Sequence, residues 1–146
     1  MSGIIVGVDG SGHSQRALEW AMKEAAIRHT PLTVLTVHEA IRGYYTSVAV
    51  FPDDQDRTAQ AQKAAQAETD EVLARLDEPR PEPVTVKAVH GFPVEELVNA
   101  GRDADMIVLG SRGAGGFTRL MVGSVADQVA RHAYCPVLLI PPENRA

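Results

Sequence analysis

Two glycine-rich segments, each following a short apolar run, are the parts of this sequence best suited to hold an anion. One reads Asp9-Gly10-Ser11-Gly12, and the other occupies 110–116 and is followed by Gly123-Ser124. Glycines let backbone N–H groups approach an anion without interference from a Cβ atom. A helix that begins near Ser124 adds unpaired N–H groups and a partial positive charge. Together these features predict a phosphate-binding site.

Side chains in the second segment suit the same chemistry. The Ser124 hydroxyl can donate a hydrogen bond to a phosphate oxygen or help to hold a metal ion, and Arg112 and Arg119 can supply positive charge. The segment is not a Walker A loop, because no Gly-Lys-Ser/Thr occurs in the chain. Nor does Gly10-x-Gly12 make the dinucleotide fingerprint, because the third glycine is missing.

The elements that must position these segments alternate between strand and helix patterns. Apolar runs predict strands at 4–8, 32–37, 84–89, 106–109 and 137–140. Helical spacing predicts a first helix around 17–25 and further helices at 56–76, 93–100 and 124–132. Ser11 or Ser14 is expected to cap the first helix, and Pro31 is expected to stop it. This alternation is typical of an open α/β fold, a parallel sheet with helices on both faces. Ligands bind such a sheet beyond the carboxyl ends of its strands, where the strand order reverses.

The glycine spacing resembles that of a known family. Gly110-x2-Gly113-x9-Gly123-Ser124 is similar to the nucleotide-binding motif of universal stress proteins. Val6-Gly7-Val8-Asp9-Gly10-Ser11 at the start and Cys135-Pro136-Val137-Leu138 near the end also resemble that family. The resemblance implies one Rossmann-like domain over 1–146, with a five-stranded parallel sheet in the order 3-2-1-4-5. The reversal then falls between the first and fourth strands, whose loops carry the glycines.

The resemblance also implies roles for individual residues. Because the glycine motif is intact, the chain resembles the ATP-binding branch of the family, with Mg²⁺ or Mn²⁺ expected beside the nucleotide. The positions implied to line the adenosine pocket are Gly7, Val8, Asp9 and Val37. Those implied to hold the phosphates are Gly110, Ser111, Arg112, Gly113, Gly115, Gly116, Gly123, Ser124, Val125 and Ala126.

Several of these side chains also have simpler interpretations. Asp9 either contacts the ribose or a metal, or it caps the helix that follows it. Val37 belongs to the core on any interpretation, and its backbone would read the adenine edge if it binds. The five histidines show no His-x3-His spacing typical of a metal site, and most are expected to be exposed. Cys135 is expected to be a small packed thiol.

Composition excludes several classes of protein. The net charge of −5, with dispersed charges, disfavours nucleic acid and anionic membrane surfaces as partners. A single cysteine excludes an intramolecular disulfide. The sequence shows neither a signal-peptide pattern nor an apolar run of about 20 residues that could span a bilayer. The expectation is therefore a cytoplasmic protein.

The function expected from the resemblance is a nucleotide-responsive signalling module of the stress response. It implies a homodimer through the last strand, Val137 to Ile140, an apolar edge that would otherwise invite pairing. The alternatives are a slow ATPase with the same pocket and an interaction protein with a vestigial loop. A flavin carrier would need aromatic residues in the glycine loops, where only Phe117 is near.

Overall fold

The computed structural model describes residues 3–39, 53–77, 79–111 and 123–141. The five strands are β1 (Ile4–Gly7), β2 (Leu32–Glu39), β3 (Val84–Gly91), β4 (Met106–Gly110) and β5 (Val137–Ile140). The helices are α1 (Gly12–Arg28), α2 (Asp53–Arg75), α3 (Pro93–Ala100) and α4 (Ser124–His132), with a short 3₁₀ turn, η1 (Gly101–Asp103), after α3. The alternation of strand and helix predicted from the sequence is confirmed, and β2 and α2 each extend a few residues beyond the predicted limits.

The strands form one parallel sheet in the order β3-β2-β1-β4-β5, as the family resemblance implied. The short, near-continuous apolar runs of β1 and β4 suit the centre of such a sheet, where both faces are covered. In β1, Ile4 pairs with Leu32 of β2 on one side and with Met106 of β4 on the other. The strand order therefore reverses between β1 and β4, and β3 and β5 are the two edge strands.

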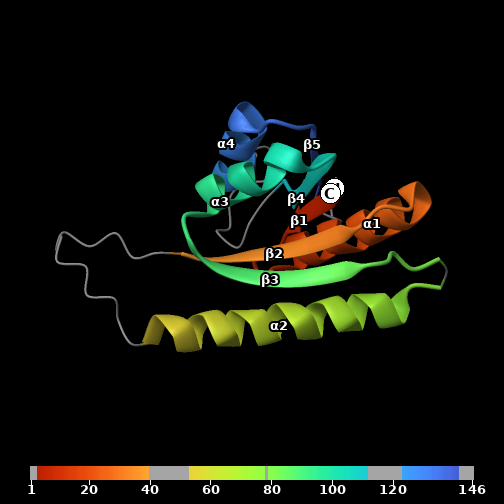
Figure 1. The fold of residues 1–146 in the computed structure, drawn as a ribbon, viewed down its shortest axis with the longest axis horizontal. Coiled ribbons are helices and arrows are strands. Elements are labelled where there is room, and N and C mark those ends of the chain that lie inside the picture. Colours follow the sequence, from red (N-terminus) through yellow and green to blue (C-terminus); the bar gives the residue numbers. More distant parts are fainter. Residues whose placement is uncertain (1–2, 40–52, 78, 112–122, 142–146) are drawn as a thin grey trace, which may run out of the picture.

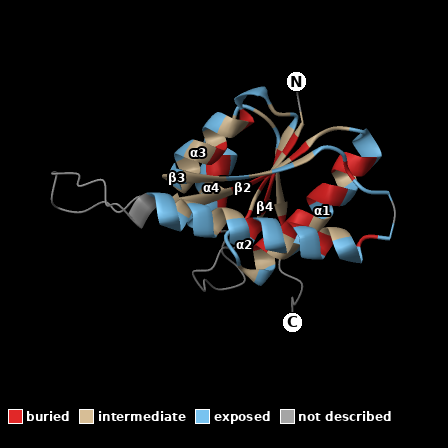
Figure 2. Cartoon of the chain, turned by 60° about the horizontal axis from the view of Figure 1, so that its bottom comes forward, coloured by how far each residue is buried: buried red, intermediate tan, exposed pale blue. Residues whose placement is uncertain are grey.

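The helices cover the two faces of the sheet in pairs (Figure 1), α1 and α2 on one face and α3 and α4 on the other. Side chains alternate along each strand, so each face has its own buried cluster. Val6, Val34 and Val108 pack against α1 and α2, whereas Leu35, Ile107 and Leu109 pack with α3 and α4. The apolar spacing of α1 buries a continuous stripe, but most of α2 is exposed (Figure 2).

Both ends of α1 are capped, and the first glycine-rich segment leads into its start. Of the two N-caps predicted from the sequence, Ser11 and Ser14, the structure uses Ser11. Its side-chain oxygen accepts a hydrogen bond from the backbone N–H of Ser14. At the other end α1 stops at Arg28, because His29 adopts a left-handed conformation (φ 53°) that helices often use to finish. Pro31 lies just beyond this cap, so the helix ends before the proline that was expected to stop it.

Candidate nucleotide-binding site

The carboxyl ends of β1 and β4 lie side by side and bring the two glycine-rich segments to one edge of the sheet. Val6 pairs with Val108, so the residues that follow the two strands leave from adjacent positions. Strand order reverses here, which is where parallel α/β sheets bind ligands. The structure therefore places Gly7, Val8 and Asp9 beside Gly110 and Ser111, as the strand order implied by the family resemblance requires.

Gly7 serves packing at this position. A Cβ atom at Gly7 would lie 2.6 Å from Cδ2 of Leu109 and 3.1 Å from Cδ2 of Leu97. The absence of a side chain thus lets β1 approach the cluster under α3 closely. Val8, which is buried, continues the strand by donating its N–H to the Leu35 carbonyl at 2.9 Å.

The loop after β1 is held by polar contacts within itself. The Asp9 carboxylate accepts the Ser11 N–H at 2.9 Å, which is an Asx turn just before the helix. The N-cap of α1 is Ser11, so the simpler interpretation of Asp9 as the helix cap is wrong. Asp9 as a whole residue is exposed. Contact of Asp9 with a ribose or metal remains a prediction.

Ser14 fastens the same loop, a role that sequence reasoning missed. Its buried hydroxyl accepts the Asp9 N–H at 3.2 Å and donates to the Ser11 carbonyl at 3.1 Å. The sequence marked Ser14 only as a possible N-cap. The sequence carried no signal for this role, because the burial that makes the hydroxyl require partners is set by packing.

The second glycine-rich segment is closed at its base by Ser111. The Ser111 N–H donates to the Ile140 carbonyl at 2.8 Å, and the Ser111 carbonyl accepts the Gly123 N–H at 2.7 Å. Both ends of the segment are thus held at the end of β4. Arg112, Gly113, Gly115 and Gly116 lie outside the described residues, so their predicted contacts are not placed.

Gly123 is buried and forms the N-cap of α4. Its carbonyl accepts the Asp127 N–H at 2.9 Å, the first bond of the helix. A glycine cap has no side chain to accept the N–H groups of Ser124, Val125 and Ala126, which lead the helix. These three N–H groups and the helix dipole therefore offer an anion site directly after the glycine-rich segment.

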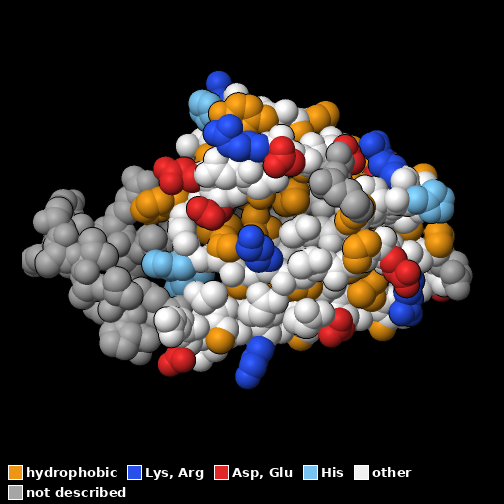
Figure 3. Space-filling view, in the orientation of Figure 1, with side chains coloured by type: hydrophobic (Ala, Val, Ile, Leu, Met, Phe, Trp, Pro, Cys, Tyr) orange, Lys and Arg blue, Asp and Glu red, His pale blue; other side chains and the backbone are white. Residues whose placement is uncertain are grey.

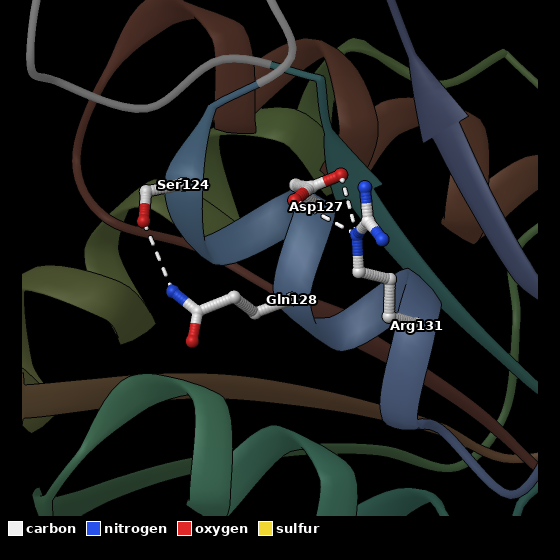
Figure 4. A network of polar contacts seen from close by, with 4 residues as sticks. All are labelled: Ser124, Asp127, Gln128 and Arg131. Atoms are coloured by element: carbon white, nitrogen blue, oxygen red, sulfur yellow. Dashed lines mark hydrogen bonds and ion pairs between the residues drawn. The ribbon is translucent and has the colours of Figure 1, made fainter.

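The side chains of α4 leave this end of the helix open (Figure 4). The exposed Ser124 hydroxyl accepts a 3.0 Å hydrogen bond from Gln128 on one side of the helix. On another side Asp127 pairs with Arg131, whose Nε lies 3.1 Å from Oδ2. The arginine offsets the carboxylate charge, which would otherwise weaken the attraction of the helix N-terminus for an anion.

Val37 lies on the part of β2 that continues beyond its pairing with β1. It lies on β2 opposite Val89 of β3 and packs against the cluster under α3. Because the Leu35 carbonyl points toward β1, the backbone groups of Val37, two residues on, point toward the same side. The pairing of β1 with β2 ends at Gly7 and Leu35, so Val37 faces the space beyond the strand.

Negative charge gathers on the α2 side of the first loop. The pKa of Glu68 is raised by partial burial and by the nearby charges of Asp9 and Glu71. Its Oε1 is shielded from solvent and makes no hydrogen bond to any residue that the structure describes. Within the described ranges, no three His, Cys, Asp or Glu side chains are arranged to hold a metal ion.

Cys135 lies away from this edge and packs against the second cluster, as expected. Burial is the main cause that raises the pKa of its thiol, so it stays protonated. No helix in the described part of the chain is long and apolar enough to span a bilayer.

The chain matches known proteins over almost its entire length. The model of the universal stress protein family matches residues 1–141. Universal stress proteins Rv1996 and Rv2005c of Mycobacterium tuberculosis are each 34% identical, over 98% and 97% of this chain. The chain spans about half the length of these curated relatives, 49% and 48%.

Solved structures share the fold. The universal stress protein UspA from Lactobacillus plantarum aligns with a TM-score of 0.78 at 27% identity, covering 95% of this chain and 97% of that one. A universal stress protein solved in complex with cAMP aligns with a TM-score of 0.67 at 23% identity, covering 96% of both chains. One from Archaeoglobus fulgidus, solved in complex with dAMP, aligns at 0.55 and 24% identity over 96% of this chain and 98% of that one. The match to the family model and the identity to curated relatives establish that this chain belongs to the universal stress protein family.

Proposed function

We propose that this chain binds ATP non-covalently at the carboxyl ends of β1 and β4 and acts as a nucleotide-responsive module of the stress response. The observation that carries the proposal is the start of α4. Its glycine N-cap, buried and bonded to Ser111, gives the N–H groups of Ser124 to Ala126 no side-chain acceptor, and among the described residues no backbone acceptor is seen for them either. A phosphate group satisfies these donors and the helix dipole together.

The adenine is expected on the β2 side of the phosphates. Val37 directs its backbone N–H and carbonyl past the end of β1, and one donor beside one acceptor matches the edge of an adenine ring. Two solved proteins of the same fold hold cAMP and dAMP, which both carry adenine. Mg²⁺ or Mn²⁺ would bind mainly through the phosphates, with Asp9 as the nearest exposed carboxylate of the loop.

The site supports nucleotide sensing more than rapid hydrolysis. Efficient phosphoryl transfer needs a group that orients the attacking water. Asp127 is paired with Arg131, and the Asp9 carboxylate accepts the Ser11 N–H. Both carboxylates therefore already serve the local structure. Slow hydrolysis is the alternative outcome, and the experiment below measures it directly.

We also propose that two copies pair through β5. This edge strand reads Val-Leu-Leu-Ile, and among the described residues no strand pairs with its outer side. An apolar edge of this kind invites pairing with another chain. The carbonyls of Pro136 and Ile140 bond to β4, so the backbone groups of Val137 and Leu139 point outward. These outward groups are the ones that a second β5 would use.

The first experiment denatures freshly purified protein and identifies the released small molecules by mass spectrometry. We expect ATP or ADP near one molecule per chain, and their ratio over time reports hydrolysis. Nucleotide-free protein is then titrated with ATP and Mg²⁺ by calorimetry, with GTP as competitor. Because the Val37 backbone is proposed to read adenine, GTP should compete weakly.

Two substitutions at Ser124 separate the contributions of the helix end. Ser124→Ala removes the hydroxyl only, whereas Ser124→Pro also removes the first N–H at a position where helices accept proline. The extended backbone of Gly123 (ψ 153°) is compatible with a following proline. A hydrogen bond to a charged group contributes about 1.5–3 kcal/mol. Ser124→Pro should therefore lower the affinity for ATP by about tenfold or more. Wild-type affinity in both folded variants would exclude the start of α4 as the phosphate site.

A further inference from the structure

Two histidines far apart in the sequence meet across two neighbouring strands. His38 in β2 and His90 in β3 are register partners, and their ring centroids lie 5.2 Å apart with the planes tilted by 35°. No local spacing in the sequence links them. The parallel pairing of β2 with β3 alone brings them together.

Both rings lie on the face of the sheet that α2 covers. Side chains alternate along a strand, and Val34 and Val86, an even number of residues away, pack in the cluster under α1 and α2. His38 is half-buried and His90 is exposed, so solvent reaches the pair. Figure 3 shows histidine atoms at the surface near the carboxyl ends of β2 and β3.

The ring separation matches shared coordination of one ion. A zinc–imidazole nitrogen bond is about 2.0–2.1 Å, so two imidazoles on one tetrahedral ion have ring centroids about 5 Å apart. The β-sheet backbone holds both residues at adjacent positions, which reduces the ordering that binding requires. Imidazole is also the ligand that zinc, copper and nickel share in proteins.

We propose that His38 and His90 form a two-histidine site for a divalent transition cation of the zinc class, with water completing its coordination. Among the residues that the structure describes, no third His, Cys, Asp or Glu joins them, so the site should be reversible rather than a permanent structural centre. It lies on β2 and β3, whereas the proposed phosphate site lies at β4 and α4.

The test titrates nucleotide-free protein with Zn²⁺ by calorimetry, comparing wild type with His38→Ala, His90→Ala and the double variant. His132→Ala, at the exposed end of α4, is the matched control. Even outer partners of metal ligands contribute about tenfold or more to affinity. Each single substitution should therefore lower the affinity for Zn²⁺ by at least about tenfold. The double variant should bind Zn²⁺ with no lower affinity than either single variant, because one remaining imidazole is not enough to form the site.

A second measurement identifies the ligands. Cu²⁺ bound to wild-type protein should give an electron paramagnetic resonance spectrum with coupling to two nitrogens, reduced in either single variant and unchanged in His132→Ala. Circular dichroism confirms that each variant is folded. The proposal is overturned if wild type binds no Zn²⁺, or if both single variants bind it as wild type does. No nucleotide is present, so this outcome is independent of ATP binding.

Discussion

The side-chain Oε1 of Gln62 in α2 accepts a 2.7 Å hydrogen bond from the backbone N–H of Ala88 in the edge strand β3. Its Nε2 donates to the Val86 carbonyl, also at 2.7 Å. These two backbone groups flank Lys87 and point away from β2, so the amide of Gln62 takes the place of a peptide group from a sixth strand. One edge of the sheet is therefore partly covered by a side chain.

Removal of this amide should destabilise the protein. Gln62→Ala leaves two part-buried backbone groups without these partners, which should lower the free energy of unfolding by about 1–3 kcal/mol. Urea denaturation measures the change. Gln66→Ala is the matched control on the same helix. Gln66 is exposed and donates to the Asp70 side chain, so its loss should change stability by less than about 0.5 kcal/mol. Equal effects in the two variants would show that Gln62 does not support the edge.

The other edge, β5, should control association. Leu139→Pro removes an N–H that points away from β4, so the ladder to β4 remains while pairing with a second copy is blocked. We expect light scattering at micromolar concentration to give a dimer for wild type and a monomer for Leu139→Pro. Leu139→Ala, which keeps the N–H and loses the side chain, should remain dimeric. A monomeric wild type contradicts the proposed dimer.

Gly7 should tolerate no larger residue. The Cβ atom of Gly7→Ala would meet Leu109 at 2.6 Å and Leu97 at 3.1 Å. Such overpacking should cost about 1–3 kcal/mol of stability, measured by thermal or urea unfolding. Gly12→Ala is the control, since nothing lies within 4 Å of its Cβ position and alanine favours the start of α1. A neutral Gly7→Ala would mean that β1 and α3 can move apart without loss.

Glu68 should make stability depend on pH. Its pKa in the folded protein is raised by burial and by Asp9 and Glu71, so the folded state binds this proton more tightly than the unfolded state does. The group's stabilising contribution is therefore complete below the ordinary glutamate pKa and is lost as the pH rises through the folded pKa. Glu68→Gln should unfold at a higher temperature than wild type at neutral pH, and the difference should vanish in acid.

An exposed carboxylate provides the comparison for that pH series. Asp77→Asn, after the end of α2, should leave the pH dependence of the unfolding temperature close to that of wild type. If Glu68→Gln followed wild type at every pH, the shielded Oε1 would carry no penalty in the folded state.

Much of the architecture could be predicted from the residues alone. Apolar runs such as 4–8 and 106–109 have the length and continuity of buried parallel strands, and the glycine spacing from Gly110 to Gly123 marks the segment proposed to bind an anion. These are local signals, because periodicity, capping and turn chemistry act over a few residues. The N-cap at Ser11 and the start of α4 at Ser124 followed from them.

The tertiary structure decided which distant residues meet. His38 and His90 became neighbours only through strand register, and Gln62 reached Ala88 only because α2 lies along β3. The buried hydroxyl of Ser14, the packing role of Gly7 and the shielded carboxylate of Glu68 likewise depend on contacts between elements. The composition and periodicity of one segment carry no record of the segment that packs against it. The sequence by itself therefore determined the elements and the residue types in the loops, and the packing of the elements determined the contacts around the proposed site.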